Sequence, residues 1–210
     1  MSAELGKIEK LDIEQFGLRK LYVVPLLFAG PEAPQDYKEK LEKYWREVNE
    51  QIANQEAKVG KIKRIYHETI SVGGEEGLKI IENINALSYL IAKDKVDCGA
   101  SFEATELADL AVECMDWERC LIMGFYSTKA AEMVASFYQQ SAMKRFEYIG
   151  RHVDETLQKN ETALLFIREG HLVQFASDIE VFSVAPPALD DIHRWLRDRS
   201  KSEDKEVSDS

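Results

Sequence analysis

Short apolar runs rich in β-branched and aromatic residues are concentrated at the two ends of the chain. Residues 21–28 read Leu-Tyr-Val-Val-Pro-Leu-Leu-Phe, and residues 61–70 form a second run of strand length. Near the other end, residues 163–167 are apolar on both faces and residues 179–184 alternate less cleanly. Together with the segment 171–175, these patterns predict five β-strands. The run without a polar face predicts a strand covered on both sides.

Two turn-forming residues refine this prediction. Pro25 lies inside the first run and has no N–H to donate, which predicts an edge strand or a bulge there. Glu169-Gly170 separates residues 163–168 from the apolar segment 171–175. Because glycine tolerates the positive φ of a tight turn, this dipeptide predicts a β-hairpin.

Between the strands, apolar residues recur every three to four positions, which is typical of helices with one buried face. The first such pattern begins after Pro34 and ends at Gly60, two residues suited to a helix start and a helix end. Further helices are predicted at about 78–91, 101–123, 128–157 and 188–199.

The order strand, helix, strand at the start predicts a right-handed βαβ crossover. We therefore expect an α/β (or α+β) protein: a layered sheet with a βαβ start, long central helices and a C-terminal unit of β-hairpin, strand and helix. Residues 20–98 are assigned to a βαβα lobe and 99–199 to a second lobe, helical and then β-rich. Residues 200–210, short and charged, are predicted to be a disordered tail.

Composition narrows the cellular setting. With 210 residues, 45% of them hydrophobic, the chain can bury one large or two small cores. No apolar run is long enough to span a membrane, and residues 1–5 lack a secretory signal pattern. The three cysteines, Cys98, Cys114 and Cys120, form no CxxC pair and suggest reduced thiols in a cytoplasmic protein.

A formal net charge of −11 disfavours direct nucleic-acid binding, which needs clustered Lys and Arg. We expect a protein partner or self-association instead, and no membrane contact. No cofactor is predicted, because residues 73–77 (Gly-Gly-Glu-Glu-Gly) lack the spacing of phosphate-binding loops and carry two carboxylates. Four carboxylates spaced at three and four, without a suitable histidine, predict a solvated acidic helix face: Glu103, Glu106, Asp109 and Glu113.

Two groups of polar residues are candidates for a ligand site. The first follows the second predicted strand, and ligands of α/β proteins bind where parallel strands end. The second shares one side of the long helix at three-to-four spacing. Lone histidines at such positions are more often plain surface or core residues. The candidate ligand-binding residues are Tyr66, His67, Glu68, Arg145, Tyr148 and His152.

Three segments near the end of the chain are followed by a predicted helix: residues 153–157 (Val-Asp-Glu-Thr-Leu), 164–167 (Leu-Leu-Phe-Ile) and 179–182 (Ile-Glu-Val-Phe). This pattern resembles the C-terminal domain of the archaeal and eukaryotic release factor and Pelota families. The resemblance implies an α/β sandwich that engages ribosomes or partner proteins. Peptide release in that family depends on Gly-Gly-Gln, whereas Glu75 follows Gly73-Gly74 here. The resemblance therefore implies no hydrolase activity.

Two functions fit these observations. The first is a non-enzymatic α/β interaction protein, which the resemblance places in translation. The alternative is a small-molecule-binding protein or enzyme, with a polar site around Tyr66, His67, Glu68 and the Arg145/Tyr148/His152 helix face.

Overall fold

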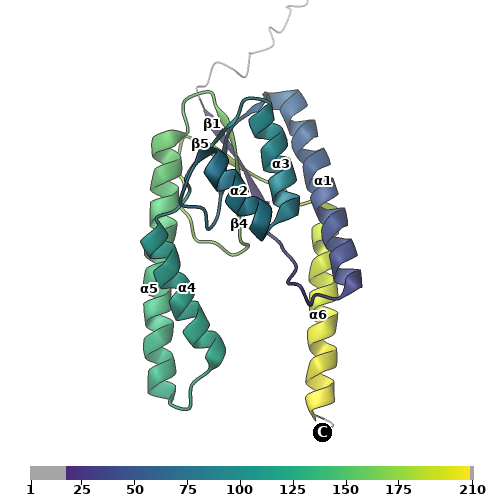
Figure 1. Ribbon diagram of the computed structural model, residues 1–210, viewed down its shortest axis with the longest axis vertical. Coiled ribbons are helices and arrows are strands. Elements are labelled where there is room, and N and C mark those ends of the chain that lie inside the picture. Colours follow the sequence, from purple (N-terminus) through teal and green to yellow (C-terminus); the bar gives the residue numbers. More distant parts are fainter. Residues whose placement is uncertain (1–17, 209–210) are drawn as a thin grey trace, which may run out of the picture.

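The computed structural model describes residues 18–208, with side chains to residue 201, and has one parallel β-sheet at its centre (Figure 1). The strand order is β3-β2-β4-β1-β5, and every pairing is parallel. The bounds are β1 Arg19–Pro25, β2 Ile62–His67, β3 Ser101–Phe102, β4 Thr162–Ile167 and β5 Ile179–Ser183. This sheet, with helices between its strands, confirms the α/β class.

The described residues form six helices where the periodic patterns predict five, and the places agree approximately, with two differences. Their bounds are α1 Gln35–Val59, α2 Gly74–Ile84, α3 Ala86–Asp97, α4 Ala108–Met123, α5 Thr128–Thr156 and α6 Pro187–Ser208. The helix predicted at 78–91 is divided at Asn85, whose Oδ1 accepts a hydrogen bond from the Ser88 N–H at 3.1 Å and caps α3. The helix predicted from Ser101 begins later, because Ser101–Phe102 pairs with β2.

The two predicted lobes contribute strands to the same sheet. β4, from the second lobe, lies between β1 and β2 of the first lobe, and all six of its residues are buried. The apolar run with no polar face thus corresponds to the central strand, as its pattern predicts. α6 continues to Ser208, into the stretch predicted as a disordered tail.

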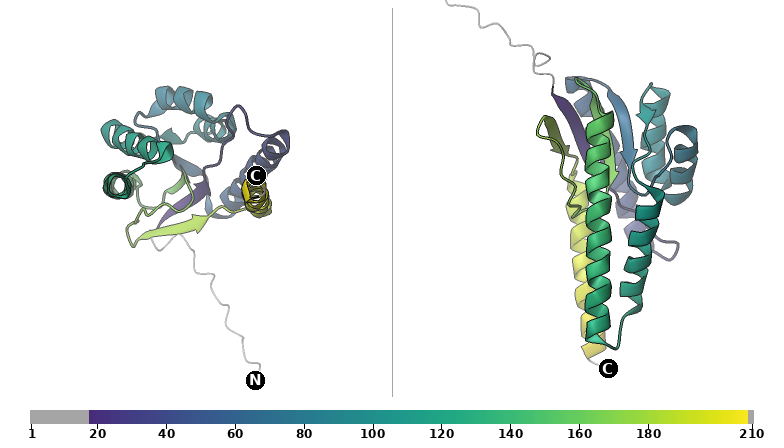
Figure 2. Two further views of the ribbon diagram at one scale, coloured as in Figure 1. Left: turned by 90° about the horizontal axis from the view of Figure 1, so that it is seen from below. Right: turned by 90° about the vertical axis from the view of Figure 1, so that its left-hand side faces the viewer.

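Helices cover the sheet on both faces (Figure 2). α1, α2, α3 and α6 pack on the face that carries Tyr22, Val24, Ile65, Leu164 and Phe166. The C-terminal half of α5 packs on the other face, against Leu21, Tyr66, Ala163, Leu165 and Ile167. Strand residues therefore alternate between two apolar cores, as expected when successive side chains point to opposite faces.

The predicted β-hairpin after β4 is wrong. Glu169-Gly170 does form a turn, with Gly170 at φ 70°. Residues 171–175 then leave the sheet and cross the face covered by α5, where Val173 is buried in that core. The apolar alternation of this segment reflects packing on α5 rather than strand pairing, and β5 pairs with β1 in parallel.

The edge or bulge predicted for Pro25 is also wrong. β1 is an inner strand, and its ladders with β4 and β5 continue without a bulge. Pro25 is tolerated because it is the last residue of the strand. The next residue, Leu26, supplies the N–H to the Ile167 carbonyl at 2.9 Å.

α4 and α5 form a helical hairpin that extends beyond the carboxyl ends of the strands, and α6 extends the same way on the other side of the molecule (Figures 1 and 2). The turn of the hairpin, residues 124–127, lies far from the sheet. No helix among residues 18–208 is both long and apolar enough to cross a bilayer.

Candidate functional site

Four charged residues meet at the carboxyl edge of the sheet, at the base of the α4–α5 hairpin. Glu68 follows β2, Arg168 follows β4, Glu106 precedes α4 and Arg145 lies on α5. Glu68, Glu106 and Arg145 are only 1–3% exposed. We call these four residues the anchor cluster.

Arg145 is the centre of this cluster. Its guanidinium binds Glu106 through two bonds, Nε to Oε2 at 2.5 Å and Nη2 to Oε1 at 2.6 Å. Nη2 also donates to Oε1 of Glu68 at 2.8 Å. Burial by itself would lower the pKa of Arg145, but the bonds and charge of Glu106 outweigh it and raise the pKa above its usual range.

The two carboxylates are saturated by further donors. Glu68 accepts the backbone N–H of Arg168 at 2.5 Å and the Nε of the same residue. Glu106 also accepts the N–H of Thr69 at 2.6 Å. Two carboxylates thus face two guanidiniums, so no net charge remains to attract a ligand. The cluster instead ties α5 and the start of α4 to the ends of β2 and β4.

This geometry changes the prediction of a solvated acidic face. Glu103 and Glu106 precede α4 and do not share a helix face with Asp109 and Glu113. Glu103 pairs with Arg64 at 2.6 Å, and Glu106 is buried against Arg145. The i, i+3 spacing was misleading because the backbone at Glu103–Glu106 follows a β-strand and is not helical.

His67 is buried on the opposite face of the sheet from the anchor cluster. Its Nδ1 lies 2.7 Å from the carbonyl oxygen of Glu68, and its Nε2 lies 3.1 Å from the Ser88 hydroxyl. Burial lowers the pKa of His67 to about 4. The ring is therefore neutral, with the Nδ1 proton donated to the carbonyl, and it serves packing of α3 on the sheet.

The remaining candidates are Tyr66, which faces α5 from β2, and Tyr148 and His152 on α5 itself. The Tyr66 hydroxyl bonds to Thr156 Oγ1 at 2.7 Å, and burial raises the pKa of Tyr66 to about 12. The rings of Tyr148 and His152 stack with their centres 5.7 Å apart, and Arg151 lies over Tyr148. The His152 Nε2 is buried without a hydrogen-bond partner among the described residues.

Between the two predicted groups, the structure joins Glu68 to Arg145 by an ion pair at 2.8 Å. The contacts of His67 with Glu68 and of Tyr148 with His152 lie within one group each. The sequence analysis did not predict that Glu106 and Arg168, which complete the cluster, belong to the site. Arg168 had a usable signal, because it directly follows a buried strand at the edge where Glu68 was selected. Glu106 had none, since 39 residues separate it from Arg145.

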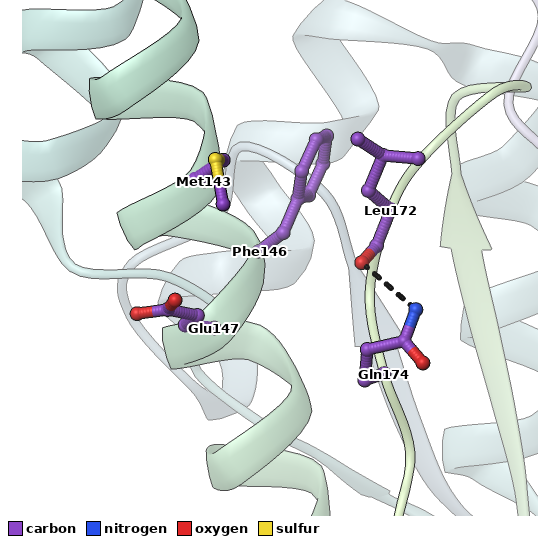
Figure 3. A pocket seen from close by; sticks show the side chains of 5 residues that line it. All are labelled: Met143, Phe146, Glu147, Leu172 and Gln174. Atoms are coloured by element: carbon purple, nitrogen blue, oxygen red, sulfur yellow. Dashed lines mark hydrogen bonds between the residues drawn. The ribbon is translucent and has the colours of Figure 1, made fainter.

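A shallow apolar pocket of about 290 Å³ lies next to the cluster, between α5 and the segment after β4 (Figure 3). Phe146 reaches toward Leu172 across it, while Glu147 points away. Gln174 donates to the Leu172 carbonyl at 3.5 Å. Because none of the six predicted site residues lines this pocket, it does not join them into one site.

The glycine-rich loop before α2 serves close packing. A Cβ on Gly77 would lie 2.3 Å from the Val72 carbonyl oxygen and 2.6 Å from the Phe102 ring. A Cβ on Gly73 would lie 2.9 Å from the Phe102 oxygen. These glycines therefore let α2 approach β3 closely, in agreement with the predicted strand-to-helix turn.

The distal part of the α4–α5 hairpin has no core of its own. Ala111 and Cys114 on α4 and Ser141 and Arg145 on α5 are buried near the sheet. From residue 115 to residue 140, no side chain is buried. There Trp117 stacks on Phe137, with ring centres 5.0 Å apart.

The end of the hairpin is apolar and uncharged. No charged residue occurs between Arg119 and Lys129. Ile122 and Met123 are 80% and 85% exposed, Phe125 is exposed and Tyr126 is fully exposed. Monomeric proteins rarely expose such contiguous apolar side chains without a binding role. We call these four residues the hairpin tip.

Methionines are restricted to the same hairpin. Apart from Met1, which lies outside the described residues, all methionines of the chain are on α4 or α5: Met115, Met123, Met133 and Met143. All four are at least 50% exposed. Exposed methionines are typical of binding surfaces, because their flexible thioether chains adapt to differently shaped partners. This restriction is visible in the sequence but was not used there.

Within residues 18–208, no group of three or more His, Cys, Asp or Glu side chains is arranged to hold a metal ion. The chain has no match among protein-family models, curated proteins or solved structures.

Proposed function

We propose that this protein is a non-enzymatic interaction protein and that the α4–α5 hairpin is its contact element. The observation that carries the proposal is the hairpin tip, an exposed and uncharged apolar surface held far from the sheet. The saturated anchor cluster supports it, because the strongest polar constellation found is used to hold the hairpin rather than to bind a substrate.

A protein partner fits this surface better than nucleic acid or a membrane. The net charge is −11, and Arg119 and Lys129 are the only cations that flank the tip. Nucleic acids and anionic lipids both need clustered positive charge for firm binding. The resemblance to release-factor domains directs the search to the translation machinery, so we propose ribosome-associated proteins as the first partners to test.

The test is site-specific photo-crosslinking in the cells that make the protein. Benzoylphenylalanine replaces Tyr126 at the tip in one variant and Phe28, an exposed aromatic of the body, in the matched control. We expect defined adducts from position 126 and none of the same mass from position 28. Adding Ile122→Ser and Met123→Ser to the first variant should remove these adducts.

Adducts that are absent at position 126, or equal at both positions, would refute the hairpin as contact element. The translation assignment has its own readout, the position of the adduct in a sucrose gradient. Adducts that sediment with ribosomal particles at low and moderate salt support it, and adducts that remain at the top of the gradient refute it.

A further inference from the structure

We infer that the outward face of α4 binds a basic amphipathic helix of a partner protein. This inference rests on the proposed function and adds the chemistry of the partner. Two independent features of α4 carry it, the spacing of its exposed apolar residues and the sign of the charges beside them.

The apolar residues of this face have heptad spacing. Ala108, Val112, Met115 and Ile122 occupy heptad positions of one face, and Arg119 takes the position between Met115 and Ile122. Val112, Met115 and Ile122 are 57%, 50% and 80% exposed. This is the spacing that packs against a second helix, yet α5 contacts a different face of α4, which includes Ala111 and Cys114.

The charges beside this stripe are mostly negative. Asp109, Glu113 and Asp116 are exposed on one flank. Glu118, beyond the other flank, is partly buried and lies 3.6 Å from Arg168. Arg119 is the single cation of α4 and is matched by Asp116 at 3.6 Å. An apolar seam lined by carboxylates complements a helix whose apolar stripe is bordered by Lys and Arg.

A second copy of this chain fits the same face less well. Antiparallel pairing of two α4 stripes would bring the row of Asp109, Glu113 and Asp116 in one copy against the same row in the other. Like charges across a helix seam disfavour pairing and direct partner choice. The methionines add adaptability, since Met115 and Met123 can fit apolar side chains of several shapes.

The test uses the full chain labelled with methyl-¹³C methionine and two designed 18-residue peptides. Both peptides carry leucine at heptad positions a and d, one with lysine and the other with glutamate at the flanking positions. All labelled methionines except Met1 are on the hairpin, so their methyl resonances report binding there. We expect the lysine peptide to shift the Met115 and Met123 resonances and the glutamate peptide to shift neither.

Paired variants separate the two features. Val112→Ser with Ile122→Ser should weaken lysine-peptide binding by about tenfold, because it removes the stripe and keeps the reporting methionines. The matched control, Ile84→Ser with Leu90→Ser, removes two similarly exposed residues from α2 and α3 and should change the Kd by less than about twofold.

The acidic flank is tested in the same way. Neutralising Asp109, Glu113 and Asp116 as Asn, Gln and Asn should weaken binding by about tenfold and flatten its salt dependence. Neutralising Glu42, Glu50 and Glu82, which are exposed elsewhere, leaves the same net charge and should have little effect. Equal losses in both triple variants would show nonspecific charge attraction and overturn the inference.

The inference also fails if the lysine peptide binds no better than the glutamate peptide, or if ultracentrifugation shows that the stripe forms a dimer of this chain. Failure here is distinguishable from failure of the proposed function. Crosslinks from Tyr126 without lysine-peptide binding would keep the hairpin as contact element and exclude only a basic helix as its ligand.

Discussion

The two ends of the α4–α5 hairpin differ in what stabilises them. Near the sheet, Arg145 is buried among two carboxylates and Ile149 and Val153 pack on the strands. At the far end, residues 115–140 bury no side chain at all. Two antiparallel helices alone leave much of each helix exposed, so the distal half depends on the base for its position.

This difference teaches how a contact element can be built without a core of its own. The base supplies rigidity through ion pairs and apolar packing, and the distal half is then free to expose side chains that would otherwise be buried. Exposure of Met123 and Tyr126 costs little stability to a helix that is fixed elsewhere.

The largest expected effect comes from breaking the base. Arg145→Met leaves Glu68 and Glu106 buried without their main cation, and should lower the free energy of unfolding by about 3–5 kcal/mol in urea denaturation. Arg151→Met is the control on the same helix, where the exposed guanidinium lies 3.8 Å from Glu155. It should cost less than about 0.5 kcal/mol, and equal losses would contradict the role of the anchor cluster.

The second expected effect is a pH dependence of the free energy of unfolding, and it originates at His67 beside the sheet. His67 is neutral when folded, with a pKa of about 4, but takes up a proton near pH 6.5 when unfolded. Between pH 4 and pH 6.5, His67 therefore takes up a proton when the protein unfolds, and acid favours the unfolded state. The free energy of unfolding should fall by about 3 kcal/mol as the pH drops from 6.5 to 4, and His67→Gln should remove that fall.

His193→Gln is the control for this titration. His193 is exposed and bonds only to Glu169 among the described residues, at 2.8 Å. Because its imidazole is exposed, its replacement should change the free energy of unfolding by less than about 0.5 kcal/mol. A slope that persists in the His67 variant would assign the acid sensitivity to other groups.

The smallest expected effect on stability comes from substitutions at the hairpin tip. Ile122→Ser with Met123→Ser should change the free energy of unfolding by less than about 0.5 kcal/mol, because both side chains are already exposed. Circular dichroism melting of the same variant used for crosslinking provides the measurement. A loss above about 1 kcal/mol would mean that the tip packs against the rest of the protein in solution.

The sequence predicted the elements better than their pairing. The run at residues 163–167 indicated a strand buried on both faces, because periodicity records local burial. The hairpin after it could not be distinguished from a crossover, since Val173 and Phe175 bury an apolar face against a helix as readily as against a strand. For Pro25, the rule that proline within a strand indicates an edge or a bulge did not apply, because Pro25 is the last residue of β1.

The candidate site shows the same limit. Glu68 could be selected because it follows a strand, and Arg145 because it shares a helix side with His152. Their contact joins residues 77 positions apart, which no local pattern encodes. The exposure of the methionines likewise depends on a feature of the fold: among the described residues, the distal halves of α4 and α5 pack on each other.

The place of β4 in the sheet constrains the order in which this chain can fold during synthesis. β4 separates β1 from β2, but it begins only at Thr162, after the whole hairpin has been made. The early strands cannot complete a sheet until most of the chain has left the ribosome, so long-range closure is a late event. Until then the newly made α4–α5 segment lacks the ion pair of Glu118 with Arg168, at 3.6 Å, and the packing of α5 on β4.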